Sequence, residues 1–397
     1  MAKIDYDVIV VGAGPAGSTT ARILSENDIR VGLLDRRKEI GMPIQCGEYF
    51  PTPGECSDIF PNSPRAKRIA TIPDKLITNR TYWTHLISPR GNITRFRFNA
   101  NIIDRARFDK HLVKRAVEQG AELHLQFRVL EKSESNRLLV KTNRGTKELA
   151  AKYIVGADGP KSIISQSIGN FHSNSQFSQS IQFVLDDTAC DQSVTEMYFG
   201  QQVAPGGYAW IIPKGGGSVN LGLGLRQFYN ERSLPLRVFL KNLMKRNPLI
   251  EPCMRHASLK HSVSALIPIG GPASITATKN TLLVGDAAGH VMASNGGGIP
   301  TAIIGGEIAA ESIIDSMDTS SSLSNYEIRW KREMGQTLFD AVKVREIADK
   351  ILSNDLITHL SMGIAGPFLL EPLIRCRLPF PVLLGSKIIV PLMKILD

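Results

Sequence analysis

Cysteine is scarce in this chain, and no two cysteines stand close together in the sequence. The five residues, Cys46, Cys56, Cys190, Cys253 and Cys376, are odd in number and widely scattered. Without a Cys-x-x-Cys pair, neither a disulfide framework nor a zinc site is expected. We therefore expect no metal ion and a reducing, cytoplasmic setting.

An export signal and long hydrophobic runs are also missing. Acidic Asp5 and Asp7 interrupt the N-terminus where a signal peptide would be basic and then apolar. No stretch reaches the roughly 18–20 uninterrupted apolar residues of a membrane-spanning helix. We expect a cytoplasmic protein, at most peripheral on the inner face of the cell membrane.

Positively charged residues moderately outnumber negatively charged ones. The 397 residues carry 47 Lys plus Arg against 37 Asp plus Glu, a formal net charge of +10, and 43% are hydrophobic. This composition is typical of a globular protein with a sizeable core. The positive excess suits nucleic acid, an anionic membrane surface or an acidic ligand. Aromatic residues interleaved with glycine and Lys or Arg are missing, so nucleic acid is not expected as a partner.

The N-terminal segment carries the strongest motif. An apolar, β-branched run at 7–11 leads into Gly12-Ala-Gly14-Pro-Ala-Gly17 and then into a helix-compatible stretch. These glycines would allow the tight turn, the approach of a pyrophosphate and the packing of helix on strand. The next apolar run ends in Asp35, whose carboxylate is placed to accept hydrogen bonds from ribose hydroxyls. An acid there, rather than arginine, favours FAD or NAD.

Two later apolar runs end in similar turns. One ends in Asp158-Gly159 and the other in Gly285-Asp286, and a glycine-rich stretch from Asn295 then opens a helix. The N-terminus of that helix offers free backbone N–H groups. Each turn alone is common, so the information lies in their order along the chain.

This order of motifs resembles the FAD-dependent monooxygenases and reductases built like para-hydroxybenzoate hydroxylase, over roughly residues 1 to 315. The resemblance implies FAD as the cofactor and a contact from Asp286 to its ribose and pyrophosphate. The stretch Asp104-Arg105-Ala-Arg-Phe108-Asp109 is similar to that group's Arg-x-x-(Phe/Leu)-Asp motif. In that motif the arginine, Arg105 here, approaches the cofactor.

Two further motifs resemble the geranylgeranyl reductases, which saturate the isoprenoid chains of archaeal membrane lipids and of chlorophyll precursors. Cys46-Gly-Glu48 looks like their Cys-Gly-Glu segment. Tyr208-Ala-Trp210-Ile-Ile-Pro, followed by Gly-Leu-Gly at 222–224, resembles their Tyr-x-Trp-x-Phe-Pro and Gly-x-Gly pattern, with isoleucine where the family usually has phenylalanine.

The second of these motifs predicts a β-hairpin. Tyr208 and Trp210 alternate, so they would share one face of a strand. Glycines inside the following strand mark close approach by a ligand or by another backbone. The two aromatic rings fit either a tunnel for a prenyl chain or the ordinary core of an antiparallel sheet.

Saturating an isolated double bond needs a hydride on one carbon and a proton on the other. A flavin can deliver the hydride, while the protein must hold the double bond, exclude water and supply the proton. Cys46 is our first candidate for a proton donor or relay, because its family match lies beside the cofactor. Glu48 and Tyr208 are alternatives, and Trp210 completes the predicted catalytic set. Taken alone, a free cysteine is more often an inert buried residue.

The predicted cofactor-binding residues come from the strand ends, the turns and the resemblance together. They are Gly12, Gly14, Ala16, Gly17, Asp35, Arg36, Cys46, Gly47, Tyr49, Arg105, Val129, Asp158, Gly159, Asp286, Gly297, Gly298 and Ile299.

We predict an α/β fold in which an FAD-binding Rossmann-like domain, of the glutathione reductase and para-hydroxybenzoate hydroxylase type, carries an inserted antiparallel sheet. The FAD-binding blocks are 1–75, 100–170 and 270–320, the substrate sheet comprises 76–99 and 171–269, and 321–397 is a helical C-terminal region. Its apolar, proline-broken and basic segment 364–394 could cover a tunnel mouth, lie at a membrane interface or cap the substrate domain.

Together these features predict an FAD-dependent reductase of geranylgeranyl chains, foremost those of archaeal-type prenylated glycerophospholipids. A flavin monooxygenase acting on an aromatic or isoprenoid substrate is the alternative, followed by a non-catalytic flavin or lipid carrier. Because no second nucleotide fingerprint is visible, the electron donor would be external: ferredoxin, a nicotinamide or a deazaflavin. We expect a monomer.

Overall fold

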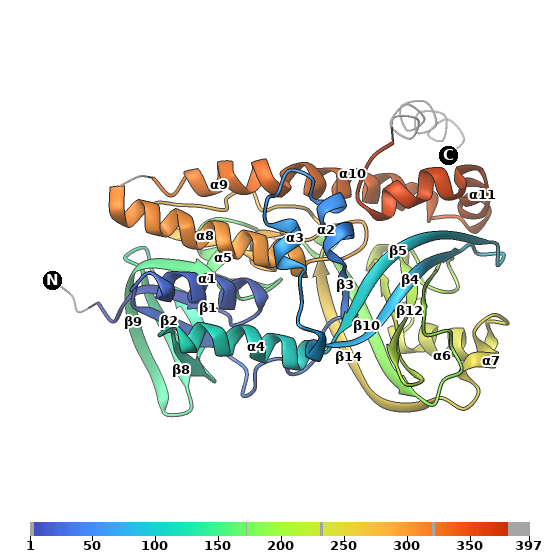
Figure 1. The fold of residues 1–397 in the computed structure, drawn as a ribbon, viewed down its shortest axis with the longest axis horizontal. Coiled ribbons are helices and arrows are strands. Elements are labelled where there is room, and N and C mark those ends of the chain that lie inside the picture. The colour runs from blue at the N-terminus through green and yellow to red at the C-terminus, as the bar shows by residue number, and fades with distance from the viewer. Residues whose placement is uncertain (1–3, 172, 231–232, 320–321, 380–397) are drawn as a thin grey trace.

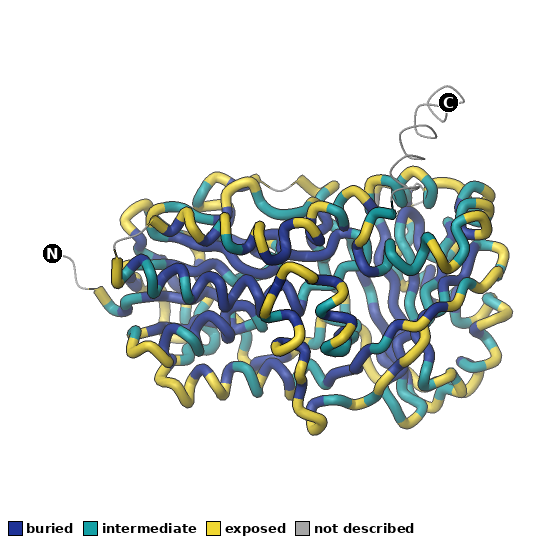
Figure 2. The backbone as a smooth tube through the Cα atoms, turned by 45° about the horizontal axis from the view of Figure 1, so that its top comes forward, coloured by how far each residue is buried: buried dark blue, intermediate teal, exposed yellow. Residues whose placement is uncertain are grey.

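A computed structural model describes residues 4–171, 173–230, 233–319 and 322–379. The molecule is elongated, with two β-sheets side by side and a layer of helices along one long edge (Figure 1). Buried backbone runs through both halves of the molecule (Figure 2). The two sheets therefore share one body, and the space between them is where a site can form.

The first sheet has seven strands. They are β1 (Tyr6–Val11), β2 (Val31–Asp35), β6 (Glu122–Leu125), β7 (Arg128–Lys132), β8 (Arg137–Thr142), β9 (Gly145–Gly156) and β15 (Thr281–Leu283). Their order is β6-β2-β1-β9-β8-β7, with β15 beside β9. β1 pairs in parallel with β2 and β9, and both β1 and β2 are almost wholly buried. A continuous apolar run such as 7–11 is what a strand covered on both faces requires.

Three helices pack on one face of this sheet. α1 (Pro15–Glu26) lies between α4 (Arg105–Glu118) and α8 (Ile299–Thr319). α8 approaches α1 so closely that a Cβ atom on Gly306 would lie 2.6 Å from the carbonyl oxygen of Ala16. The hydroxyl of Thr20 donates to the carbonyl of Gly306 at 3.0 Å. The small residues of α8 thus serve helix packing.

The second sheet has eight strands. They are β3 (Tyr49–Pro51), β4 (Ile77–Ile87), β5 (Ile93–Ile103), β10 (Phe177–Asp186), β11 (Val194–Tyr198), β12 (Tyr208–Gly215), β13 (Ser218–Leu225) and β14 (Ser258–Pro268). Their order is β14-β10-β13-β12-β11-β4-β5-β3. The predicted hairpin is confirmed, because β12 and β13 pair antiparallel with Trp210 opposite Gly222. One face of the sheet packs on α6 (Leu236–Arg246), which leaves the other face free to line a site.

The division of the chain between the two sheets differs from the prediction at two points. β3 falls inside the predicted block 1–75, yet it pairs with β5 in the second sheet. β5 itself continues to Ile103, past the predicted boundary at 99. The chain crosses from the first sheet to the second between β2 and β3, so the segment around Cys46 lies at the junction of the two.

The C-terminal helices form the layer along the long edge. They are α9 (Asn325–Trp330), a π-helical turn at Lys331–Gly335, α10 (Gln336–Ile351) and α11 (Asp355–Ile374). In the described part of the chain, α11 is the one helix long and apolar enough to cross a membrane by length and composition, and 11% of its apolar window is buried. Of the predicted segment 364–394, residues 364–374 belong to α11, and 380–394 lie outside the described residues.

The remaining elements are short connectors. They are α2 (Pro53–Ile59), α3 (Ala66–Ile69), α5 (Ile163–Ser167), α7 (Glu251–Met254) and the 3₁₀ turns Asp74–Leu76, Asn174–Gln176, Gln227–Tyr229 and Gly285–Ala288.

Candidate active site

The glycines of the first turn are required by backbone contacts. Gly12 has a φ of +105°, and a Cβ atom there would lie 2.2 Å from the carbonyl oxygen of Ala157. A Cβ atom on Gly17 would lie 1.9 Å from the carbonyl oxygen of Gly12. Gly14 and Gly159 differ, because nothing lies within 4 Å of the Cβ position at either residue. Open space over these two glycines, at the N-terminus of α1, fits a pyrophosphate approaching the backbone.

Asp35 ends β2 as predicted, but its carboxylate already has partners. It accepts the N–H of Ala13 at 2.9 Å, and Arg37 binds it through Nε at 2.9 Å and Nη2 at 2.7 Å. Burial favours the neutral acid, yet the hydrogen bonds and charge of Arg37 hold the pKa of Asp35 below its usual value. A ribose hydroxyl would therefore share this carboxylate with Arg37. Arg36, the predicted cofactor residue, is exposed, and the side chain that turns back to Asp35 is that of Arg37.

The side chains of two more predicted cofactor residues have partners within the fold. Asp158 accepts hydrogen bonds from the hydroxyl of Ser162 at 2.5 Å and from the N–H of Ile163 at 2.8 Å, at the start of α5. Val129 is buried in a hydrophobic cluster with Leu138 and others. Neither side chain lines the cavity described next. Asp-Gly turns and apolar strand residues have these structural roles routinely.

A cavity of about 360 Å³ lies between the two sheets. It brings together predicted residues from five separate stretches of chain, which is what a bound dinucleotide would need. The predicted cofactor residues that line it are Gly14, Ala16, Cys46, Gly47, Tyr49, Arg105, Gly159, Asp286, Gly297, Gly298 and Ile299. We call this space the dinucleotide cavity.

Arg105 and Asp286 are the charged side chains that line the dinucleotide cavity. Arg105 opens α4, and its Nε and Nη2 atoms each lie 3.0 Å from the carboxylate of Asp109. Burial alone would lower the pKa of Arg105, but Asp109 and Cys46 raise it, so the guanidinium stays charged. Burial raises the pKa of Asp286 to about 6, and the charge of Arg105 limits that rise. Among the described residues, the cavity is therefore lined by one fixed cation and by one carboxyl that is mostly neutral only below about pH 6.

Glu48, predicted as a possible proton donor, does not line the cavity. Its buried carboxylate accepts hydrogen bonds from Lys214, from Nδ2 of Asn220 at 2.9 Å and from the backbone N–H of Arg105 at 3.2 Å. Its backbone is left-handed, with a φ of 64°. With three donors on two oxygens, Glu48 holds the Cys46-containing turn against the second sheet, and its place in the catalytic set stays a prediction.

Cys46 and Gly47 are held by the second sheet at the cavity wall. The carbonyl of Cys46 accepts from Nε2 of Gln182 at 3.0 Å, and that of Gly47 accepts from Nδ2 of Asn220 at 3.0 Å. The Sγ atom of Cys46 accepts the N–H of Glu48 at 3.1 Å. Sequence reasoning did not single out Gln182, Lys214 or the role of Asn220, because hydrogen-bond partners on distant strands leave no local signal.

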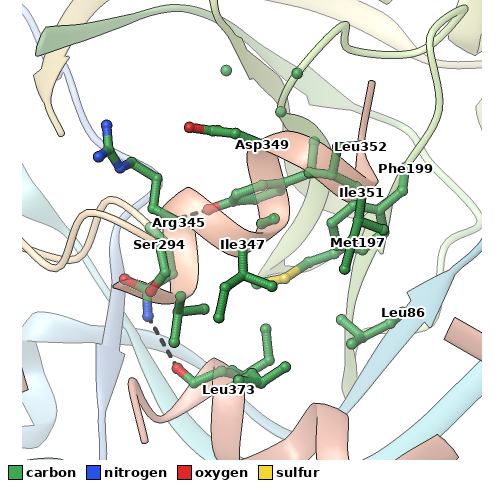
Figure 3. A pocket seen from close by; sticks show the side chains of 18 of the residues that line it. Leu86, Met197, Phe199, Ser294, Arg345, Ile347, Asp349, Ile351, Leu352 and Leu373 are labelled. Carbon is green, nitrogen blue, oxygen red and sulfur yellow. Dashed lines mark hydrogen bonds between the residues drawn. The ribbon is translucent and has the colours of Figure 1, made fainter. Parts of the chain in front are cut away.

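A second cavity, of about 260 Å³, lies between the second sheet and helices α10 and α11 (Figure 3). Most of its lining is aliphatic or aromatic, including Leu86, Phe199, Ile347 and Leu373. We call it the apolar cavity. Helices α10 and α11 form one wall of this cavity. Of the roles predicted for the segment 364–394, this position supports the role of covering a tunnel for the part that belongs to α11.

Tyr208 and Trp210 stand where the two cavities meet. Both residues line each cavity, together with Met197, Ile267, Asn295, Gly296 and Ile374. The Tyr208 hydroxyl donates to the carbonyl of Asn295 at 2.6 Å, and Nε1 of Trp210 donates to Gln182 at 3.2 Å. Gly222, which lies opposite Trp210 on β13, has no room for a side chain, because a Cβ atom there would lie 2.3 Å from the indole ring. The group that comes close to this strand glycine is therefore the side chain of Trp210.

Comparison with known proteins identifies related families for both parts of the site. A model of the geranylgeranyl reductase catalytic domain matches residues 176–259, and a model of NAD(P)-binding Rossmann-like domains matches residues 10–65. The chain is 31% identical over 364 residues to digeranylgeranylglycerophospholipid reductase of Methanococcus vannielii, with 88% of each chain covered. It is also 31% identical to digeranylgeranylglycerophospholipid reductase 2 of Methanopyrus kandleri, with 89% of each chain covered.

Solved structures share the fold at lower identity. A geranylgeranyl bacteriochlorophyll reductase-like protein of Thermoplasma acidophilum matches with a TM-score of 0.78 and 22% identity, over 94% of this chain and 99% of that one. A flavin-dependent brominase matches with a TM-score of 0.74 and 15% identity, over 98% of this chain and 100% of that one. A Rossmann-like dinucleotide-binding domain joined to a second sheet is therefore an architecture shared with flavin-dependent enzymes of different chemistry.

Proposed function

This chain belongs to the digeranylgeranylglycerophospholipid reductase family, and we propose that it is an FAD-dependent enzyme that saturates the geranylgeranyl chains of archaeal-type prenylated glycerophospholipids. One observation carries the proposal. The dinucleotide cavity adjoins an apolar cavity walled mostly by aliphatic and aromatic side chains, and Tyr208 and Trp210 line both. A prenyl chain lying in the apolar cavity would bring a double bond to the end of the dinucleotide cavity.

FAD is the cofactor we propose for the dinucleotide cavity. The open space over Gly14 and Gly159 and the N-terminus of α1 suit its pyrophosphate. When bound and reduced, the flavin supplies a hydride to an alkene carbon. The residues of the chain would hold the alkene, exclude water through the aliphatic walls and deliver a proton to the second carbon. Cys46 is the candidate for that proton, since its thiol lies at the cavity wall next to Arg105.

Anaerobic turnover tests the function directly. The yellow holoenzyme is reduced with dithionite without oxygen and mixed with a geranylgeranyl phospholipid. We expect a mass gain of about two units for each saturated double bond, together with reoxidation of the flavin. A flavin monooxygenase would leave the lipid mass unchanged until oxygen is admitted. A colourless protein with no flavin would exclude both enzymes and leave a carrier role.

We propose that reducing equivalents come from an external donor. The glycine-rich turn Gly12-Ala-Gly14-Pro-Ala-Gly17 would bind one dinucleotide, which we propose is FAD. The described residues contain no second turn of this kind for a nicotinamide dinucleotide. Ferredoxin, a nicotinamide and a deazaflavin are distinguished by adding each in turn and following the loss of the flavin absorbance.

We further propose that the protein binds the surface of an anionic bilayer through the outer face of α11. Leu356, Leu360 and Ile364 follow one another at four-residue spacing before a break in the helix at Gly366, and they are 49%, 53% and 85% exposed. Phe368, just after the break, is 82% exposed. Met362, on the same helical part as the first three, lines the apolar cavity. A lipid substrate must leave a bilayer to enter that cavity, and the formal net charge of +10 favours an anionic surface.

Ile364→Glu should weaken binding to vesicles that contain phosphatidylglycerol by about tenfold or more, because a buried apolar side chain contributes about 1.5–3 kcal/mol. Vesicle flotation measures the effect. Leu259→Glu is the matched control, since Leu259 is 57% exposed but lies on β14. Equal binding by the two variants would contradict membrane docking. Conversion of a dimer to a monomer by Ile364→Glu would instead make α11 a contact between two copies.

A further inference from the structure

The apolar cavity has a charged end. Arg226, Arg345 and Asp349 are the charged side chains among the residues that line it. Arg345 and Asp349 are four residues apart on α10, so they share one face of that helix. In Figure 3 both lie on the side of the cavity away from Leu86 and Leu373. Charge is thus gathered in one place in a cavity that is otherwise suited to hydrocarbon.

Arg226, Arg345 and Asp349 line the apolar cavity and not the dinucleotide cavity. On β13, Gly224 lines the apolar cavity, and Arg226, two residues further along the chain, lines it as well. Asn220 holds the Cys46 turn, and Gly222 lies against Trp210. Gly224 pairs with Tyr208, which lines both cavities, and two residues of extended chain, about 7 Å, separate Gly224 from Arg226.

The cations at this end are incompletely paired. Arg226 Nη2 lies 2.8 Å from Asp349 Oδ1, with side chains only 14% and 18% exposed. Arg345 bonds Glu346 through Nη2 at 3.0 Å, but its buried Nε has no hydrogen-bond partner among the described residues. Burial lowers the pKa of Arg226 and raises that of Asp349, as expected for a pair removed from water. A buried, unpaired guanidinium N–H is costly unless a ligand supplies an acceptor.

We propose that Arg226 and Arg345 bind the phosphate of the lipid substrate, with its prenyl chain extending along the apolar cavity toward Trp210. The arginine fork matches phosphate oxygens, and Asp349 holds Arg226 in position until a phosphate takes its place. This inference rests on the proposed function. The phosphate could be a phospholipid headgroup or the diphosphate of a free prenyl diphosphate, and both provide the same acceptors.

The test compares three substrates in the holoenzyme: a geranylgeranyl phospholipid, geranylgeranyl diphosphate and geranylgeraniol, which has no phosphate. Arg226→Met and Arg345→Met should each raise KM for the phosphate-bearing substrate about tenfold, since a hydrogen bond to a charged group contributes about 1.5–3 kcal/mol. KM for geranylgeraniol and kcat should stay within about twofold. Arg226→Lys should recover part of the loss, because it restores charge without the fork.

Arg144→Met is the matched control, because Arg144 is exposed in the turn between β8 and β9. Whichever phosphate substrate responds identifies the source of the anion. A KM that rises equally for geranylgeraniol, or that does not change for either phosphate substrate, would overturn the headgroup site while leaving the reductase intact. Binding can also be measured without turnover. Calorimetry should show that Arg226→Met and Arg345→Met lose affinity for a saturated phospholipid but not for the corresponding diether glycerol, which has no phosphate. If the wild type reduces none of the three substrates, the proposed function itself is wrong.

Discussion

Replacing Cys46 with serine should lower the rate of double-bond saturation about 100-fold or more, the usual contribution of a positioned general acid, while flavin remains bound. Cys46 lies at the wall of the dinucleotide cavity in a turn held by Gln182 and Asn220. The other two predicted proton donors already have hydrogen-bond partners. The Glu48 carboxylate accepts hydrogen bonds from Lys214 and Asn220 outside the cavity. The Tyr208 hydroxyl donates a hydrogen bond to the backbone carbonyl of Asn295.

The measurement is single-turnover lipid saturation by prereduced enzyme, with flavin content read from absorbance. Cys190→Ser serves as the matched control, because Cys190 is a partly exposed thiol that lines neither cavity. Unchanged turnover in Cys46→Ser would remove the thiol from the mechanism. Asp286, whose pKa is raised to about 6 by burial, would then be the next group to examine at the same cavity.

Gly14→Val should give a folded protein that holds less than about one-tenth of the wild-type flavin. At Gly14 the backbone is extended, with a φ of −80°, and nothing lies within 4 Å of a Cβ position, so the fold accepts the side chain. The added methyl groups would enter the space proposed for the pyrophosphate. Overfilling a packed space costs about 1–3 kcal/mol or more, which is tenfold or more in affinity.

Flavin stoichiometry and thermal unfolding of the cofactor-free protein are the two readouts. Gly54→Val is the control, since Gly54 also has nothing within 4 Å of its Cβ position but lies exposed on α2. Equal flavin content in both variants would place the pyrophosphate elsewhere. The opposite case is Gly12, where a side chain would strike the Ala157 carbonyl and should impair folding itself.

The parts of the site that could be predicted are those whose requirements are local. The turn at Gly12, Gly14 and Gly17 joins a strand to a helix within a few residues, so its glycines follow from backbone geometry. The alternation of Tyr208 and Trp210 likewise predicted the hairpin, because side-chain direction in a strand has a period of two.

The sequence does not show the partners that distant elements supply. Glu48 was predicted as an alternative proton donor, and Lys214 and Asn220 engage its carboxylate from β12 and β13. Arg36 and Arg37 are indistinguishable by residue type, and only the position of the backbone after β2 selects Arg37 for Asp35.

The sequence by itself determined the dinucleotide turn, the alternating hairpin and the family, because short-range geometry and residue identity carry that information. The tertiary structure decided which of these residues face a common space. It placed α10 and α11, which begin 111 and 130 residues after the end of the hairpin, as a wall of the apolar cavity and brought Arg226 opposite Arg345 and Asp349. Contacts of that kind come from the packing of whole elements against each other, and no local pattern records which distant side chains will meet.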